Sequence, residues 1–354
     1  MAAKFFDNLK NGVFNNEVCI DLGTVSVLIY VKGRGIVLRE PSVVIVDKDT
    51  ETIVKVGEEA RKVLGRTPEG QEVVRPLRGG VINRYNVTQQ MVQHYIKKAC
   101  GNAMVKPKVV VCIPSCATDV DELAVFDAIN QSGSRQTFLV EEPIAAALGA
   151  GLDISEPKGK MVVDIGGGTS DIAVIALDGI VVSESIKIAG DAFDEAIMRY
   201  VREKHELVIG YDTAEHIKRK IGSLSQSKGE NKKLNVTGRC IKTRLPKTVT
   251  LTSSEMLGAL YQPVTAIIEA ISRVIMSTPP ELVRDIVSTG IVMTGGGSLI
   301  PGLDKLVERI TGIRTEVAPN ALTCVTAGMG KLLDMMADGK DVSVSLLREH
   351  RNRN

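Results

Sequence analysis

The chain has 354 residues, of which 44% are hydrophobic and 24% charged, as in an ordinary globular protein. This length favours two domains over one core. A formal net charge of +2, with 3% aromatic residues and no Trp, argues against a nucleic-acid binder, whether for duplexes or for single strands.

The six cysteines form no C-x-x-C pair, which favours reduced thiols in a cytoplasmic protein. Cys19 and Cys112 lie inside apolar runs, where a free Cys acts as a small hydrophobe. No apolar run reaches about 18 residues, so we expect no membrane span. The N-terminus also lacks the basic-then-apolar order of a secretory signal.

Strand-like and helix-like runs alternate along the chain, which predicts an α/β architecture. We expect strands at 18–31 (two strands around a turn), 35–46, 52–56, 108–113, 137–140, 234–241, 247–251 and 290–293. We expect helices at 89–100, 119–131, from 143 onward, 191–206, 213–222, 254–277 and after 298. The polar segment 225–233 is typical of a solvated loop tip.

Two stretches of the chain resemble one another, 18–33 and 161–179. Both contain an apolar strand, an Asp, a glycine turn, a Thr and a second strand. Such a repeat indicates duplicated domains that face each other across a cleft, each offering an Asp and a turn of open N–H groups to a shared ligand.

The chemistry of these turns suits an anion held with a cation. Glycine lets the backbone approach a ligand closely, and successive N–H groups form an anion-binding nest. Thr24 and Thr169 add hydroxyl donors, whereas Asp21 and Asp164 suit Mg²⁺, with its waters, between them and phosphates. A plain β-hairpin explains one such turn equally well, but two matched turns and a third glycine cluster at 295–297 favour a clamp on Mg-polyphosphate.

Other nucleotide motifs are absent. The chain has no G-x-x-x-x-G-K-[ST] motif. The glycine clusters at 166–168 and 295–297 continue to Asp171 and Ile300, where a dinucleotide fingerprint needs Gly or Ala. Both departures argue against NAD.

Two acidic residues carry a functional and a structural interpretation each. Glu142 precedes Pro143 at a strand-to-helix junction, where it could orient a water for attack on a γ-phosphate or only favour the positive helix N-terminus. Glu215 fits a capping-box variant that begins at Asp212. It also shares a helix face with Lys218, from which both could reach a ribose.

The motifs DLGT, VEEPIAAALGAG, DIGGGT, IAGD, AEHIK and TGGGSLIPGLD occur in this order and resemble the actin–Hsp70–sugar kinase superfamily. The stretches KGRGIVLREPSVV, LGRTPEG, RPLRGGVI and TPPELVRDIVSTGIVMTGGG resemble the MreB family of bacterial actins. The resemblance spans roughly residues 18–333.

The resemblance implies an actin-like, duplicated RNase H-like fold with a central nucleotide cleft and four subdomains. These would be IA (1–36, 76–149 and 323–354), IB (37–75), IIA (150–189 and 251–322) and IIB (190–250). It also implies Mg-ATP or Mg-ADP as the ligand, with Asp21 and Asp164 near the metal through water.

The resemblance further assigns roles to residues that match the family motifs. The first phosphate loop would contain Asp21, Gly23 and Thr24. The second would contain Asp164, Gly166, Gly167, Gly168 and Thr169. Glu142 and the Thr169 hydroxyl would position the attacking water. The sugar and base would lie near Gly190, Asp191, Glu215 and Lys218. The adenosine and α-phosphate would lie over Gly295, Gly296 and Gly297.

Members of this family are slow ATPases that polymerise into double protofilaments on the inner membrane face and determine bacterial cell shape, so we expect the same here, with further membrane or cytoskeletal partners. A small-molecule kinase is the alternative, but it needs an acceptor pocket and a catalytic base for which no motif is seen. A chaperone would need a further substrate-binding domain.

The sequence departs from the family pattern at four places: at Ser26 with its neighbours Val25 and Val27, at Gly79, at Arg84 and at Cys116. These departures leave the phosphate-binding and water-positioning residues intact. We expect them to affect the turnover rate, subdomain motion or filament contacts rather than ATP binding.

Both chain ends could bind an anionic membrane. Phe5, Phe6 and Leu9 share a helical face at the N-terminus, and the C-terminus is basic. A frayed or core-docked N-terminus and a disordered charged tail are the alternatives.

Overall fold

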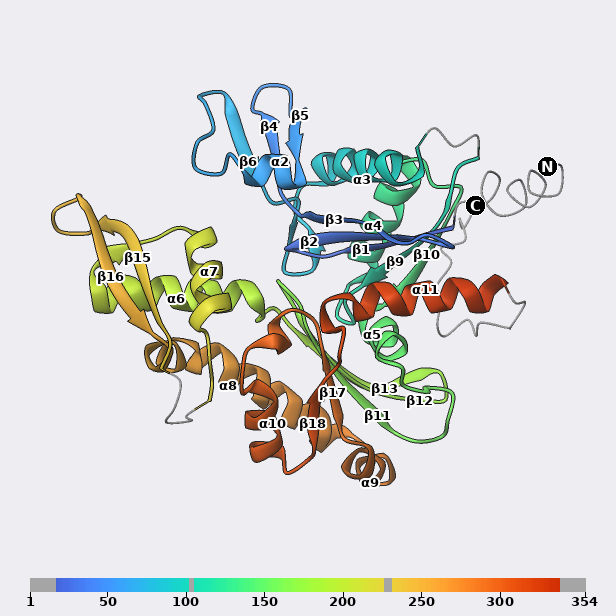
Figure 1. Ribbon diagram of the computed structural model, residues 1–354. Helices are drawn as coiled ribbons and strands as arrows, with labels where there is room; N and C mark the ends of the chain where they lie inside the picture. The colour runs from blue at the N-terminus through green and yellow to red at the C-terminus, as the bar shows by residue number, and fades with distance from the viewer. Residues whose placement is uncertain (1–16, 102–104, 226–230, 338–354) are drawn as a thin grey trace, which may run out of the picture. The chain divides into compact units, whose positions relative to one another are not determined.

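The computed structural model describes residues 17–101, 105–225 and 231–337 (Figure 1). The chain divides into two compact units. Of the described residues, unit 1 takes in 17–101, 105–158, 175–181 and 322–337, and unit 2 takes in 159–174, 182–225 and 231–321. The boundaries of the four subdomains stay a prediction.

Unit 1 is built on a five-stranded sheet in the order β10-β9-β1-β2-β3. Its strands are β1 (Glu17–Leu22), β2 (Ser26–Val31), β3 (Gly35–Pro41), β9 (Lys108–Ile113) and β10 (Gln136–Glu141). Strands β1, β9 and β10 are parallel, whereas β2 is antiparallel to β1 and β3. Helices α3 (Tyr85–Cys100) and α4 (Asp119–Gln131) pack on one face, and α5 (Glu142–Ala150) and α11 (Cys324–Ala337) on the other (Figure 1).

The chain between β3 and α3 forms smaller elements. They are β4 (Val44–Asp47), β5 (Ile53–Val56), α2 (Gly57–Arg61), β6 (Gln71–Val74) and the hairpin β7 (Leu77–Arg78) and β8 (Val81–Ile82). The single strand expected at 35–46 is wrong, because the chain leaves the β2 ladder at Pro41 and β4 pairs instead with β5 and β6. Proline lacks the N–H that a longer ladder would need.

The main sheet of unit 2 also has five strands, in the order β13-β12-β11-β17-β18. They are β11 (Lys160–Ile165), β12 (Ser170–Ala176), β13 (Gly179–Ile186), β17 (Ile291–Thr294) and β18 (Thr315–Val317). Parallel pairing joins β11 to β17 and β17 to β18. In reverse, the order of the unit 1 sheet is β3-β2-β1-β9-β10, and each of its strands has a counterpart at the same place in the unit 2 sheet. The repeat seen in the sequence therefore extends over both sheets.

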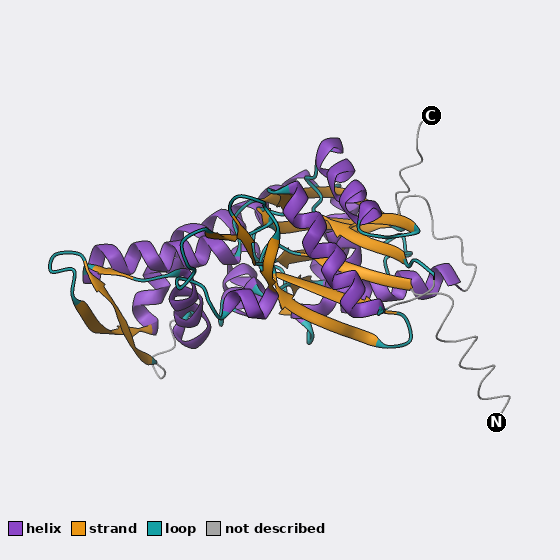
Figure 2. Ribbon diagram, turned by 90° about the horizontal axis from the view of Figure 1, so that it is seen from above, coloured by secondary structure: helices purple, strands orange, loops and turns teal. Residues whose placement is uncertain are grey.

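The remaining elements of unit 2 are α6 (Gly190–His205), α7 (Tyr211–Ile221), α8 (Ser253–Ser277), α9 (Pro280–Thr289), η1 (Gly297–Leu299), α10 (Leu303–Thr311) and a sheet of β14 (Leu207–Val208), β15 (Lys233–Cys240) and β16 (Pro246–Thr252). The short helix η2 (Ala321–Thr323) precedes α11. The described chain combines helices and strands (Figure 2), as the sequence predicts, but the strands also come in runs, of which β1 to β5 is the longest.

Helix ends show where local signals succeed and fail. Helix α8 begins with a capping box of Thr252 and Glu255. The capping box expected at Asp212 is wrong, because Asp212 already lies inside α7, whose N-cap is Gly210 without a side-chain bond. The proline pair at 279–280 ends α8 as predicted, but Pro280 also opens α9.

Helix α8 is long and apolar enough to cross a membrane by length and composition alone. Its inner face, however, belongs to the hydrophobic core of unit 2, through Met256, Leu260, Ile267 and Ile271. This is the pattern of a core helix in a globular unit.

Candidate functional site

Three chemically active side chains lie at one edge of the unit 1 sheet. Asp21, Cys112 and Glu142 stand at or just beyond the carboxyl ends of β1, β9 and β10. Because these strands are parallel, their carboxyl ends share an edge, which is where open α/β sheets bind ligands. Burial raises the pKa of the Cys112 thiol well above its usual range, and the charges of Asp21 and Glu142 add to the effect, so the sulfur stays a thiol.

The Asp21 carboxylate is held from two sides. The Cys112 Sγ donates to its Oδ1 at 3.6 Å, and the Thr326 hydroxyl of α11 donates to its Oδ2 at 3.2 Å. Burial nevertheless raises the pKa of Asp21 to about 6, against the lowering effect of both hydrogen bonds. A carboxylate so deprived of solvent is suited to a nearby cation.

The turn after Asp21 is tight. The Gly23 N–H donates to the Ser26 carbonyl at 3.1 Å, and a Cβ on Gly23 would lie 2.8 Å from that oxygen. Thr24 is buried, and its Oγ1 accepts from the Gly80 N–H at 3.0 Å, so its own proton remains to donate.

Unit 2 repeats this arrangement. Asp164 is the last residue but one of β11 and pairs with Thr294 of β17, whose Oγ1 donates to Asp164 Oδ1 at 2.6 Å. The Gly166 N–H donates to the Thr169 carbonyl at 2.9 Å, as Gly23 does in unit 1. The first N–H of each turn therefore closes the turn, and the open N–H groups that the sequence predicts would have to follow it.

The start of α6 docks on the second turn. The Gly190 and Asp191 N–H groups donate to the Gly166 and Gly167 carbonyls at 3.1 and 2.7 Å. A Cβ on Gly190 would lie 3.1 Å from the Gly166 oxygen, which explains a glycine there. The glycine turn that begins at Gly166 and the start of α6 at Gly190, which are 24 residues apart in the sequence, are thus in direct contact.

Helix α7 is tied to α6 by Lys218. Its Nζ lies 2.8 Å from Asp194 Oδ2 and donates to the Gly190 carbonyl at 2.9 Å. Burial raises the pKa of Asp194 to about 6 even though the Lys218 charge opposes it. Glu215 lies on the same helix, 3.9 Å from Arg219. The Lys218 side chain therefore braces Gly190 within unit 2.

The third glycine cluster packs against the end of β11. A Cβ on Gly295 would lie 2.3 Å from the Ile165 carbonyl oxygen, and one on Gly297 would lie 2.3 Å from Ile165 Cγ2. Gly295 also has φ +80°. Close packing against Ile165 therefore requires glycine at positions 295 and 297, and Gly296 lies between them.

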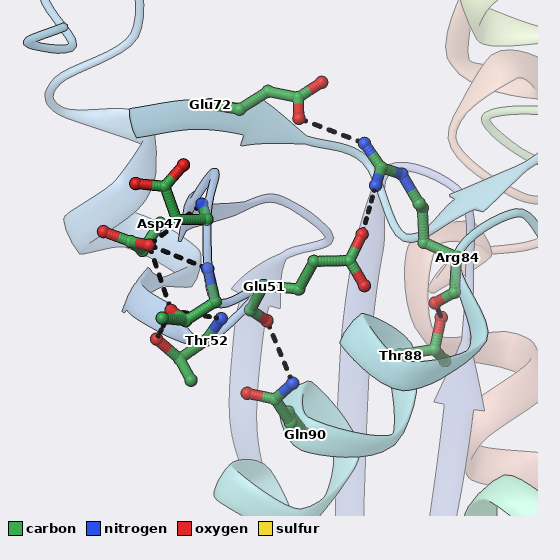
Figure 3. A network of polar contacts seen from close by, with 9 residues as sticks. Asp47, Glu51, Thr52, Glu72, Arg84, Thr88 and Gln90 are labelled. Atoms are coloured by element: carbon green, nitrogen blue, oxygen red, sulfur yellow. Dashed lines mark hydrogen bonds and ion pairs between the residues drawn. The ribbon is translucent and has the colours of Figure 1, made fainter. Parts of the chain in front are cut away.

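The four departures fit their surroundings. Gly79 and Gly80 turn the β7–β8 hairpin with φ +55° and +77°. Arg84 pairs with Glu51 at 2.8 Å and with Glu72 at 3.0 Å (Figure 3), and so ties the start of α3 to the small β4–β6 sheet. Cys116 is exposed and has no positive φ, so its side chain meets no backbone strain. Ser26 begins β2 and closes the first turn.

The structure thus gathers the predicted site residues into two sets. Unit 1 holds Asp21, Gly23, Thr24 and Glu142. Unit 2 holds Asp164, Gly166, Gly167, Gly168, Thr169, Gly190, Asp191, Glu215, Lys218, Gly295, Gly296 and Gly297. That the two sets face a common ligand stays a prediction. The Phe5, Phe6 and Leu9 stretch and the basic C-terminus lie outside the described residues.

Sequence reasoning missed four side chains that hold the site: Cys112, Asp194, Thr294 and Thr326. Cys112 looked like a small hydrophobe within an apolar run, yet it contacts Asp21. Strand pairing, rather than a local motif, reveals it. Only Thr294, next to the glycine cluster, carried a signal in the sequence.

Two sheets of the same strand order, each with an Asp near the end of its central strand and a tight turn after it, define a duplicated actin-like fold. The crystal structures of MreB5 of Spiroplasma citri bound to ADP and to AMPPNP match with TM-scores of 0.86 and 0.87. Each is 34% identical in sequence, and each match covers 92% of this chain and 98% of the other.

The family model described as MreB/Mbl protein matches residues 15–341. The cell shape-determining protein MreB of Escherichia coli (strain K12) is 47% identical over 331 residues, covering 92% of this chain and 95% of that protein. The cell shape-determining protein Mbl of Bacillus subtilis (strain 168) is 44% identical over 325 residues, covering 92% and 97%. The chain belongs to the MreB/Mbl family. Membership agrees with the cytoskeletal interpretation of the sequence and not with the small-molecule kinase.

Proposed function

We propose that this protein is a cytoskeletal ATPase that polymerises into actin-like filaments and determines bacterial cell shape, with ATP binding and hydrolysis controlling assembly. Two relatives that match nearly the whole chain are named cell shape-determining proteins. The similar MreB5 structures hold ADP and AMPPNP.

One observation carries the nucleotide part of the proposal. In each unit the last residue but one of a central strand is an Asp that a side chain of the neighbouring strand holds. A tight turn with a buried Thr follows each strand. Carboxylates, hydroxyls and glycine turns make an oxygen-rich donor set that fits Mg²⁺ with phosphates. The described residues contain no cluster of three or more His, Cys, Asp or Glu that could hold a metal. Asp21 and Asp164 would therefore act through water, as Mg²⁺ sites with few carboxylates do.

The remaining residues take roles that follow from their places. When bound, Mg²⁺ neutralises charge on the phosphates. Gly23, Thr24 and the turn at 166–169 would hold the phosphates. Glu142 and the Thr169 hydroxyl would orient the attacking water. Gly190 and Asp191 would lie at the sugar, where Lys218 holds the Gly190 carbonyl, and Glu215 and the 295–297 cluster would complete the nucleoside site.

The proposal places the filament, as double protofilaments, on the inner face of the cell membrane. The apolar N-terminal face of Phe5, Phe6 and Leu9 and the basic C-terminus are the proposed contacts with anionic lipid. Many weak anchors on one filament would add up, because a polymer presents them together. Deleting both ends should therefore abolish the flotation of filaments with anionic vesicles in a density gradient, and unchanged binding would contradict this part.

The proposal is tested by sedimenting purified protein with Mg-ATP, Mg-ADP or no nucleotide while phosphate release is followed. Glu142→Ala should still pellet with Mg-ATP but release phosphate at least about tenfold more slowly, because general-base and water-orienting groups contribute factors of about 10²–10⁴. Glu141→Ala is the matched control, since the neighbouring acid is the N-cap residue of α5. Protein that never pellets, and releases phosphate only when a small-molecule acceptor is added, would refute the filament.

A further inference from the structure

The two main sheets place a hydrogen-bond donor beside each turn aspartate, but the donors differ. In unit 2, Thr294 pairs in register with Asp164 across parallel strands, and its hydroxyl donates to Oδ1 at 2.6 Å. In unit 1, β1 pairs with β9 as far as Ile20 and Val111. The next residues along these strands are Asp21 and Cys112, whose Sγ lies 3.6 Å from Oδ1.

We infer that Cys112 is a positioning residue for Asp21, the counterpart of Thr294 for Asp164, and that both set how well Mg-nucleotide is held. The inference rests on the proposed function, because it takes both aspartates to act on Mg-nucleotide. It goes further by giving a role to a thiol that sequence alone presents as core filler.

The contacts of Asp21 explain how such positioning works. The thiol donates to Oδ1 and the Thr326 hydroxyl donates to Oδ2, so a donor on each oxygen fixes rotation of the carboxylate. Groups that orient metal-associated carboxylates typically change metal affinity by about 10–100-fold when they are removed. A thiol is a weaker donor than a hydroxyl, so Cys112 should lie at the low end of that range.

Matched substitutions separate a donor from a space filler. Cys112→Thr and Cys112→Val give side chains of nearly the same shape, and only threonine keeps a donor. Thr294→Cys and Thr294→Val repeat the comparison in unit 2. Cys19→Val is the control, because Cys19 is a buried thiol on β1, whereas the donors to the two Asp21 oxygens are Cys112 and Thr326.

The experiment measures ADP affinity of the full chain by calorimetry over a series of Mg²⁺ concentrations, with thermal unfolding in parallel. We expect Cys112→Val and Thr294→Val to need about tenfold more Mg²⁺ for half-maximal affinity. Cys112→Thr, Thr294→Cys and Cys19→Val should stay within about twofold of wild type, since they keep or never had the donor. If Cys112 and Thr294 only fill space, their Val variants would instead change thermal stability and leave the Mg²⁺ dependence of ADP binding unchanged.

The outcomes are distinguishable. If the wild type binds ADP and the Val and Thr variants of Cys112 share its Mg²⁺ dependence, the inference is overturned while the proposed function stands. An equal shift in Cys19→Val also overturns it, because the effect then comes from packing. A wild type that binds no ADP at any Mg²⁺ concentration overturns the proposed function as well. Should Cys112→Val not fold, Cys112→Ala takes its place in the same comparison.

Discussion

The contact between α5 and α11 gives a sharp test of how this fold holds its site. A Cβ on Gly328 of α11 would lie 1.8 Å from the Ala145 carbonyl oxygen of α5, and one on Gly149 would lie 1.8 Å from the Cys324 carbonyl oxygen. Ordinary contact begins at 3.4 Å. Gly328→Ala must therefore push the two helices apart by ~1.6 Å, the difference between these distances.

We expect Gly328→Ala to destabilise the protein by about 3 kcal/mol, at the upper end of overpacking costs, because the obstacle is backbone rather than a flexible side chain. For unfolding of unit 1, a unit of roughly 200 residues, this corresponds to a loss of roughly 6–12 °C in the unfolding midpoint. Separation of the helices would also move Thr326 away from Asp21, since Thr326 lies in the same helix. Thermal unfolding of nucleotide-free protein, followed by circular dichroism, measures the effect.

Gly258→Ala is the matched control, because Gly258 lies inside α8 with nothing within 4 Å of its added Cβ. Alanine there should stabilise the protein by about 0.5–1 kcal/mol through its better helix propensity. If both variants shift the midpoint in the same direction, or if Gly328→Ala matches wild type, the argument from close helix contact is refuted.

Three further predictions follow from side-chain contacts. Burial alone would raise the pKa of Glu40, but its bonds to Lys98 and to a backbone N–H outweigh this and lower it. The stability from the Glu40 carboxylate is therefore present above about pH 4.5 and lost as pH falls through its lowered pKa. Glu40→Gln should thus cost about 1–2 kcal/mol at pH 7 in urea unfolding and nothing near pH 2, and an equal cost at both values would contradict it. Arg84→Ala should lower the free energy of unfolding by less than about 1 kcal/mol, because its two ion pairs are exposed. Amide hydrogen exchange in the β4–β6 sheet should nevertheless become faster at low salt. Unchanged exchange would show that the two ion pairs do not stabilise this sheet. Lys218→Met should weaken ADP binding about tenfold by releasing the Gly190 carbonyl and leaving Asp194 without its cation, with an unchanged Mg²⁺ dependence; a shifted Mg²⁺ dependence would place Lys218 at the metal instead.

Local patterns predicted the elements well where their signals are local. The expected strand at 108–113 and helix at 119–131 match β9 and α4 residue for residue. The helix α9 was missed, because the same two prolines that end one helix can open the next. The break between β3 and β4 was missed too, because a continuous apolar run does not show where the chain changes its partner strand.

By itself the sequence determined the mixture of strands and helices, the repeat that contains Asp21 and Asp164, and the glycine turns, because each of these is encoded within a few consecutive residues. Only the tertiary structure decided which side chains hold those acids. Cys112 reaches Asp21 across 91 positions, Thr294 reaches Asp164 across 130, and Thr326 reaches Asp21 across 305. Strand pairing and helix packing create such contacts, and neither leaves a local pattern, since any small donor at the right register can serve.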